Sequence, residues 1–149
     1  MAAAEALNIV LVDDDEDDRS FFKEAIDEID IHTNLSMFTN GQEFIDHITI
    51  TGQVLPQVVF LDLNMPIKNG MECLEEIKKN NLLSKFSVAI YSTSSSEQDI
   101  ENTFVKGAHI YINKPNSFKQ LKAVIEKVLK INWQYQNSNL NRDNFLLRL

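Results

Sequence analysis

Residues 9–18 of the chain read IVLVDDDEDD, so four apolar residues run directly into six consecutive acids. A short apolar run of this kind is typical of a strand that is buried on both faces of a parallel sheet. Six neighbouring carboxylates repel one another, which raises their pKa values and destabilises a compact fold. A chain that places such a run at the end of a buried strand is expected to bind a cation there.

The rest of the chain alternates between strand-like and helix-like segments. Short apolar runs predict five strands, at 7–12, 34–38, 58–61, 86–91 and 109–112. Amphipathic stretches between and after them predict five helices, which begin near residues 17, 41, 70, 97 and 116. Such alternation predicts an α/β fold with a five-stranded parallel sheet, covered by helices on both faces through right-handed crossovers.

Polar side chains follow four of the predicted strands. The first strand ends in Asp13 and Asp14, the third in Asp62, the fourth in Ser92, and the fifth just before Lys114. In open parallel sheets, ligands bind beyond the carboxyl ends of the strands. We therefore expect these three acids, the hydroxyl and the lysine to lie together at one edge of the sheet.

These residue types suit phosphoryl chemistry that depends on Mg²⁺, a cation that prefers one or two carboxylates together with phosphate oxygens and water. Asp14 and Asp62 can supply the carboxylates, with Asp13 binding directly or through a water. Asp62 is a candidate nucleophile, because a carboxylate can attack a phosphoryl group and form an aspartyl phosphate. Lys114 and the metal would neutralise the phosphoryl oxygens, and Ser92 could donate its hydroxyl to one of them.

Four segments in order carry a resemblance to a known family: VDDDEDD (12–18), VVFLDLNMPIKNG (58–70), AIYSTSS (89–95) and YINKP (111–115). Over about residues 7–131 the chain resembles the receiver domains of bacterial response regulators, the phosphorylated partners of histidine kinases. The spacings of 30 residues from Asp62 to Ser92 and of 22 from Ser92 to Lys114 match that family. The resemblance implies a doubly wound, flavodoxin-like sheet with strand order 2-1-3-4-5.

The resemblance also implies a role for each matching residue at the acidic end of the site. Asp62 corresponds to the phosphoacceptor, and Asp13 and Asp14 correspond to the acidic pair that holds Mg²⁺. Asn64 occupies the position whose backbone carbonyl binds the metal. The remaining acids have other expected uses: Glu16, Asp17 and Asp18 cap the following helix and meet its positive end.

Three further positions correspond to the switch of the family. Ser92 matches the hydroxyl that moves toward the phosphate, with Thr93 as the neighbouring alternative. Tyr111 matches the aromatic residue that swings inward when this hydroxyl moves, although it also reads as a half-buried strand aromatic. Lys114 and Pro115 match a pair whose peptide bond is often cis, a form that costs only about 0.5–1 kcal/mol before proline.

The function that follows is a two-component response regulator that works as a switch rather than as a metabolic enzyme. Asp62 would receive a phosphoryl group from a sensor histidine kinase or a histidine phosphotransfer protein. The domain would catalyse this transfer and the slow hydrolysis of its own phosphate. Phosphorylation would then change binding to a downstream protein or self-association.

Two alternatives from other classes start from the same residues. The acid run fits a calcium-binding EF-hand loop at 13–24 in part, with Asp13, Asp15, Asp17 and Glu24 at positions 1, 3, 5 and 12. However, Asp18 stands where that loop needs glycine, and a strand precedes the run. A phosphatase of the haloacid dehalogenase type would use the same chemistry, but it needs an acid two residues after the nucleophile. Asn64 occupies that position.

Charge and composition restrict the class of protein further. The net charge is −8, and residues 1–62 hold 14 acids but only 2 bases, which argues against nucleic-acid binding. The longest apolar runs are far shorter than the roughly 20 residues of a membrane-spanning helix. Cys73 is the single cysteine, and the first residues lack the features of a signal peptide. These features favour a cytoplasmic protein.

The sequence predicts a short disordered lead-in at 1–6, one receiver domain at 7–131, and an extension at 132–149. The 18 residues of the extension are too few for a DNA-binding domain with its own core. The extension nevertheless contains the apolar run Phe145-Leu146-Leu147. Two interpretations stay open for it: a frayed helix extension, or a segment that docks on its own domain or on a second copy in a homodimer.

Overall fold

A computed structural model describes residues 6–50, 52, 54–131 and 145–146. The predicted lead-in lies outside these residues except for Ala6, and so does most of the predicted extension. The strands are β1 (Leu7–Val12), β2 (Thr33–Phe38), β3 (Val58–Leu61), β4 (Ser87–Ser92) and β5 (Ile110–Asn113). The helices are α1 (Glu16–Glu28), α2 (Gly41–Ile48), α3 (Gly70–Lys79), α4 (Glu97–Val105) and α5 (Phe118–Leu129).

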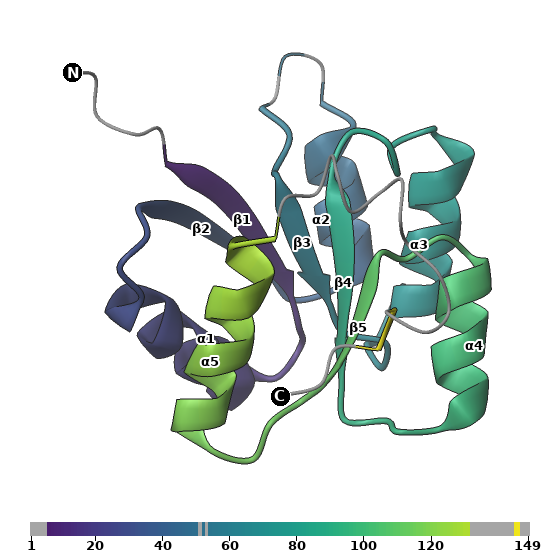
Figure 1. Cartoon of the computed structure of the whole chain (residues 1–149). Coiled ribbons are helices and arrows are strands. Elements are labelled where there is room, and N and C mark those ends of the chain that lie inside the picture. The colour runs from purple at the N-terminus through teal and green to yellow at the C-terminus, as the bar shows by residue number, and fades with distance from the viewer. Residues whose placement is uncertain (1–5, 51, 53, 132–144, 147–149) are drawn as a thin grey trace.

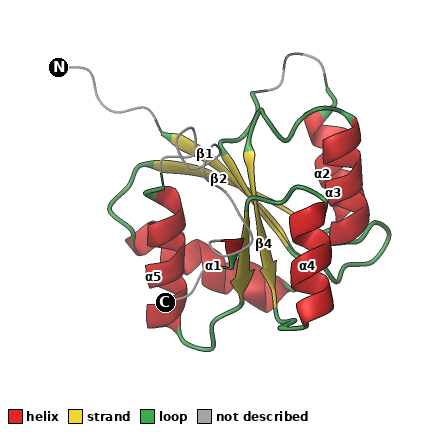
Figure 2. Cartoon of the chain, turned by 45° about the vertical axis from the view of Figure 1, so that its right-hand side comes forward, coloured by secondary structure: helices red, strands yellow, loops and turns green. Residues whose placement is uncertain are grey.

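The five strands form one parallel sheet in the order β2-β1-β3-β4-β5 (Figures 1 and 2). The predicted α/β fold class and strand order are therefore confirmed, and all five predicted helices are found within the described part of residues 6–131. Helices α1 and α5 cover one face of the sheet, and α2, α3 and α4 cover the other (Figure 1). No helix in the described part of the chain combines the length and the apolar character that a membrane span requires.

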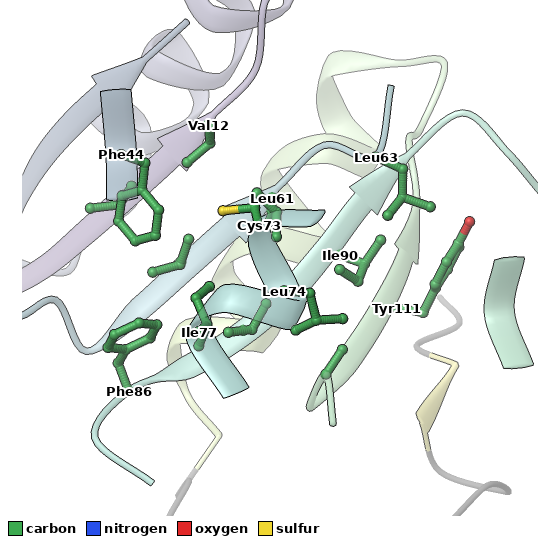
Figure 3. Packing of buried hydrophobic residues seen from close by; sticks show 14 of the residues in the cluster. Val12, Phe44, Leu61, Leu63, Cys73, Leu74, Ile77, Phe86, Ile90 and Tyr111 are labelled. Carbon is green, nitrogen blue, oxygen red and sulfur yellow. The ribbon is translucent and has the colours of Figure 1, made fainter. Parts of the chain in front are cut away.

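The continuous apolar strands are explained by two cores, one on each face of the sheet. Ile9 and Leu11 pack with α1 and α5, whereas Val10 and Val12 pack with α2, α3 and α4. Because successive side chains of a strand point to opposite faces, a strand covered on both sides is apolar at every position. Figure 3 shows the second core, in which Cys73 is buried and burial raises the pKa of its thiol to about 12.

Each helix begins with a polar side chain that accepts a hydrogen bond from its first turn. For α1 this cap is Asp15, which accepts from the N–H of Asp18, so the expectation that the three following acids cap the helix was wrong. Those acids lie in the first turn, where the positive end of the helix favours them. For α3, Asn69 and Glu72 form a reciprocal capping box that fixes the helix start.

The start of α3 lies directly against the end of β3. The N–H of Gly70 donates to the carbonyl of Leu63 at 2.9 Å. A methyl group on Gly70 would overlap the Asp62 carbonyl oxygen and lie 2.7 Å from Leu63 Cα. Glycine is therefore required here by close backbone approach, and α3 supports the backbone that carries Asp62.

We expect Gly70→Ala to lower the free energy of unfolding by about 1–3 kcal/mol, because the methyl group must displace the backbone of residues 62 and 63. Urea denaturation measures this change. Glu75→Ala is the matched control on the same helix, since it removes only an exposed ion pair with Lys106 and is expected to cost less than about 1 kcal/mol. Equal losses for the two variants would contradict the close approach.

Candidate functional site

Three carboxylates converge at the ends of β1 and β3. The two strands pair in register up to Val12 and Leu61, and the N–H of Asp62 donates to the Val12 carbonyl at 3.0 Å. This pairing brings Asp13, Asp14 and Asp62 together, with one oxygen of each within 4.8 Å of the others. Asp13 and Asp62 are buried and Asp14 is exposed. An all-carboxylate set of this kind fits a hard divalent cation.

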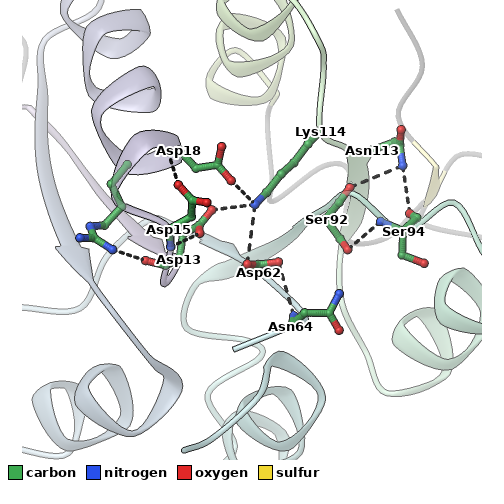
Figure 4. Close-up of polar contacts among 10 residues, drawn as sticks. Asp13, Asp15, Asp18, Asp62, Asn64, Ser92, Ser94, Asn113 and Lys114 are labelled. Atoms are coloured by element: carbon green, nitrogen blue, oxygen red, sulfur yellow. Dashed lines mark hydrogen bonds and ion pairs between the residues drawn. The ribbon is translucent and has the colours of Figure 1, made fainter. Parts of the chain in front are cut away.

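Lys114 reaches the same site from the residue after β5. Its Nζ lies 2.8 Å from Asp13 Oδ2, 2.9 Å from Asp18 Oδ2 and 3.6 Å from Asp62 Oδ2 (Figure 4). Its backbone N–H donates to the Ser92 carbonyl at 2.8 Å, which ties it to the end of β4. Lys114 therefore connects three carboxylates from two segments, the start of α1 after β1 and the end of β3, which are far apart in sequence.

Asp18 is a site residue that sequence reasoning missed. It was expected to act at the helix start, and its carboxylate also forms an ion pair with Lys114. The available signal was its position in the first turn of a helix that begins beside the acidic pair. That signal is weak, because the sequence does not show toward which side of α1 the lysine arrives.

Burial dominates the electrostatics of the two inner acids. It raises the pKa of Asp62 from 3.8 to about 6, against the lowering effect of the Lys114 charge. Burial likewise raises the pKa of Asp13, although hydrogen bonds from Lys114 and from the Asp15 N–H oppose the change. Burial alone would lower the pKa of Lys114, but its hydrogen bonds to Asp13 and Asp18 raise it overall. One ammonium group thus faces three carboxylates, with Asp14 as a further acid beside Asp13 and Asp62, and the site favours a further cation.

The hydroxyl side of the site is built around Ser94. Ser92 is fully buried, whereas the neighbouring Thr93 is exposed, so Ser92 is the hydroxyl that faces the interior. The Ser94 N–H donates to Ser92 Oγ at 3.1 Å. The hydroxyl of Tyr111, which is completely buried, donates to the Ser94 carbonyl at 2.8 Å. Asn113 also donates to this carbonyl, at 3.0 Å (Figure 4).

Asn64 lies in an exposed loop between β3 and α3. Its N–H donates to Asp62 Oδ1 at 3.4 Å, and its expected use of the backbone carbonyl as a metal ligand stays a prediction. The same loop contains Ile67 at φ 68°, with the Lys68 N–H donating to the Pro66 carbonyl at 2.7 Å. A branched residue in this left-handed region is strained, so the turn beside Asp62 is held by its surroundings.

The prediction of a cis bond between Lys114 and Pro115 was wrong, because no cis peptide bond is present in the described ranges. The cis and trans forms before proline differ by only about 0.5–1 kcal/mol, so neighbouring contacts decide between them. Here the trans bond accompanies a Lys114 side chain that points to Asp13 and a Lys114 N–H that is bonded to Ser92.

The calcium-loop interpretation does not fit this arrangement. Asp15, which would be a ligand in that loop, caps α1 instead. The acids that converge among the described residues are Asp13, Asp14 and Asp62, and the last of these comes from another strand. The site therefore joins several strand ends rather than one continuous loop.

A doubly wound sheet whose strand ends bring together an acidic pair, a buried aspartate, a hydroxyl and a lysine defines the class of receiver domains. The family model of the response regulator receiver domain matches residues 9–126. The chain belongs to this family and is a response regulator receiver of two-component signal transduction.

Individual relatives agree with this assignment. The chain is 27% identical to the probable methanogenesis regulatory protein FilR2 of Methanothrix harundinacea, over 86% of this chain and 84% of FilR2. It is also 27% identical to response regulator Rcp1 of Synechocystis sp., over 80% of this chain and 84% of Rcp1.

Solved structures show the same fold. The Mn²⁺-bound form of Rcp1 matches with a TM-score of 0.75 and 27% identity, covering 85% of this chain and 94% of Rcp1. The phosphorylated cyanobacterial phytochrome response regulator RcpA matches with a TM-score of 0.76 and 26% identity, covering 92% of this chain and 98% of RcpA.

The raised pKa of Asp62 predicts a pH dependence of stability in metal-free buffer. Between about pH 4 and pH 6 the folded protein keeps a proton that the unfolded chain has lost, so the free energy of unfolding falls as pH rises. The loss has an upper limit of about 3 kcal/mol. Urea unfolding with a chelator present checks this, and Asp62→Asn is expected to flatten the profile. A profile that the substitution leaves unchanged would contradict the assignment.

We further expect Asp18→Asn to weaken divalent-cation binding by about 1 kcal/mol, roughly fivefold. Without Asp18, Lys114 is held by Asp13 and Asp62 alone and competes more strongly with the cation for their oxygens. Asp17→Asn removes the same charge from the neighbouring exposed position and serves as the control. Calorimetric titration measures the Mg²⁺ affinity of both variants. If the two substitutions weaken Mg²⁺ binding equally, Asp18 acts only through its negative charge and not through its contact with Lys114.

Proposed function

We propose that Asp62 is the phosphoacceptor of this receiver domain. The observation that carries the proposal is the buried Asp62 carboxylate, held between Lys114 at 3.6 Å and two further acids. Its pKa of about 6 leaves it mostly ionised at neutral pH, as a nucleophile requires. Receiver domains interact with histidine kinases or phosphotransfer proteins, so a phosphohistidine is the proposed donor.

In the proposed transfer, an oxygen of Asp62 forms a bond to phosphorus while the bond from phosphorus to the donor histidine nitrogen breaks. The electron pair of the broken bond returns to the donor imidazole. The ammonium group of Lys114 lies within 3.6 Å of carboxylate oxygens of Asp13, Asp18 and Asp62. It would therefore need only a small movement from Asp13 to reach a phosphoryl oxygen on Asp62. The chain contributes mainly position and charge compensation, which dominate catalysis of phosphoryl transfer.

The proposed metal is Mg²⁺, held by Asp13, Asp14, Asp62 and the backbone carbonyl of Asn64. The oxygen-only donor set and the Mn²⁺-bound form of Rcp1 support a divalent cation at this place. When bound, the metal supplies positive charge to the phosphoryl oxygens. Its binding also relieves the repulsion between Asp13 and Asp62, which Lys114 opposes as well.

The proposed switch consists of Ser92 and Tyr111. The Ser92 hydroxyl would turn to donate to a phosphoryl oxygen on Asp62, which alters its hydrogen bond with the Ser94 N–H. The Tyr111 hydroxyl donates a hydrogen bond to the Ser94 carbonyl. A change in the position of Ser94 would therefore alter the position of the Tyr111 side chain. The proposed output is altered binding of a downstream protein or of a second copy. For a haloacid dehalogenase type of phosphatase, Asn64 still stands where an acid is required.

The test is intact mass spectrometry after incubation with acetyl phosphate and Mg²⁺. We expect the wild type to gain one phosphoryl group per chain and Asp62→Asn to gain none, because the amide is not nucleophilic. Asp46→Asn, at an exposed position on α2, is the control and is expected to react like the wild type. An adduct that persists in Asp62→Asn would refute the site, and repeated turnover of a phosphomonoester would favour the phosphatase.

A further inference from the structure

Phe145, near the end of the chain, is buried against the domain. Only 1% of its surface is exposed, which places it among the largest fully buried side chains. Its ring lies 5.2 Å from that of Phe104 on α4 and 6.2 Å from that of Tyr111 on β5. The next residue, Leu146, forms a parallel β-bridge with Tyr111 (Figure 1).

This contact uses a free edge of the sheet. Strand β5 is the last strand in the order β2-β1-β3-β4-β5, so no other strand of the five described ones pairs with its outer side. Such an edge readily accepts an extended segment. Leu146 lines a hollow of about 550 Å³ together with Ile112 on β5, Val124 on α5 and Pro115 in the connection between these two elements. Of the two described residues of this segment, Phe145 is buried and Leu146 is partly buried.

The Phe145 ring contacts Tyr111, one of the two residues of the proposed switch. Phe145 packs on Tyr111, the Tyr111 hydroxyl is bonded to the Ser94 carbonyl, and the Ser94 N–H is bonded to the Ser92 hydroxyl. Tyr111 is completely buried in this arrangement. The two rings pack edge to face with their centroids 6.2 Å apart, so a movement of the Tyr111 ring disturbs its contact with Phe145. Docking of Phe145 and the inward position of Tyr111 therefore favour one another.

We propose that Phe145 and Leu146 dock in cis on the edge formed by α4 and β5 and hold Tyr111 inward, so that this docking and phosphorylation of Asp62 stabilise each other. The inference rests on the proposed function, because it assigns regulation to the same phosphorylation site. Coupling between two sites is reciprocal. If phosphorylation of Asp62 strengthens the docking of Phe145 by a certain factor, docking of Phe145 stabilises phosphorylated Asp62 by the same factor. Removal of the Phe145 ring therefore loses that stabilisation.

The first experiment measures binding of beryllofluoride, a phosphoryl mimic, to the full chain at fixed Mg²⁺ concentration. We expect Phe145→Ala to bind it roughly fivefold more weakly than the wild type, at the lower end of typical allosteric couplings. Val105→Ala is the control, because it truncates an apolar side chain that is next to Phe104 but 64% exposed. Circular dichroism and urea unfolding confirm that both variants fold. Equal affinity of Phe145→Ala and wild type would overturn the proposal.

The second experiment measures hydrogen exchange of the segment that contains Phe145 and Leu146. We expect beryllofluoride to slow this exchange in the wild type. Tyr111→Phe keeps the ring beneath Phe145 but loses the bond to Ser94, so its segment is expected to stay protected without responding to beryllofluoride. An unchanged response in Tyr111→Phe would overturn the proposed path even if Phe145→Ala failed to fold.

Protection that rises with protein concentration would show that a second copy supplies the segment, which would overturn docking in cis. The acetyl phosphate experiment separates this inference from the function on which it rests. If the wild type accepts no phosphoryl group, the proposed function and the inference both fail. If it does accept one while Phe145→Ala binds beryllofluoride like the wild type, only the inference fails.

Discussion

The structure depends on the placement of two carboxylates, Asp13 and Asp62, in a buried position at the ends of neighbouring strands. Burial raises the pKa of both groups, and their charges repel each other across the register of β1 and β3. Lys114, which follows the edge strand β5, offsets this repulsion. Its ammonium group contacts both acids and also Asp18. A site with this excess of negative charge favours the binding of a divalent cation.

The surroundings of the site are arranged to keep these groups in place. Gly70 lets α3 start against the backbone of Asp62, and the capping box of Asn69 and Glu72 fixes that start. On the other side, the end of β4 is linked to β5 through the bond from the Lys114 N–H to the Ser92 carbonyl. The rigid sheet therefore sets the distances between side chains that come from four strands.

The hydroxyl side of the site leads outward along a chain of direct contacts. Ser92, Ser94 and Tyr111 are joined by hydrogen bonds, and Tyr111 is covered by Phe145. Tyr111 thus contributes to the core on one side and to the edge of the sheet on the other. The relatives Rcp1 and RcpA share the fold of this chain at 27% and 26% sequence identity.

The sequence by itself determined the fold class, the strand order through family resemblance, and the identity of the converging residues. It could do so because apolar strands buried on both faces and polar strand ends leave a clear pattern at Asp13, Asp62, Ser92 and Lys114. Only the tertiary structure decided that Asp18 pairs with Lys114, that Asp15 caps α1, that the bond before Pro115 is trans, and that Phe145 covers Tyr111. These features depend on side-chain directions, on an isomer preference of about 0.5–1 kcal/mol and on contacts between distant segments, none of which residue order specifies.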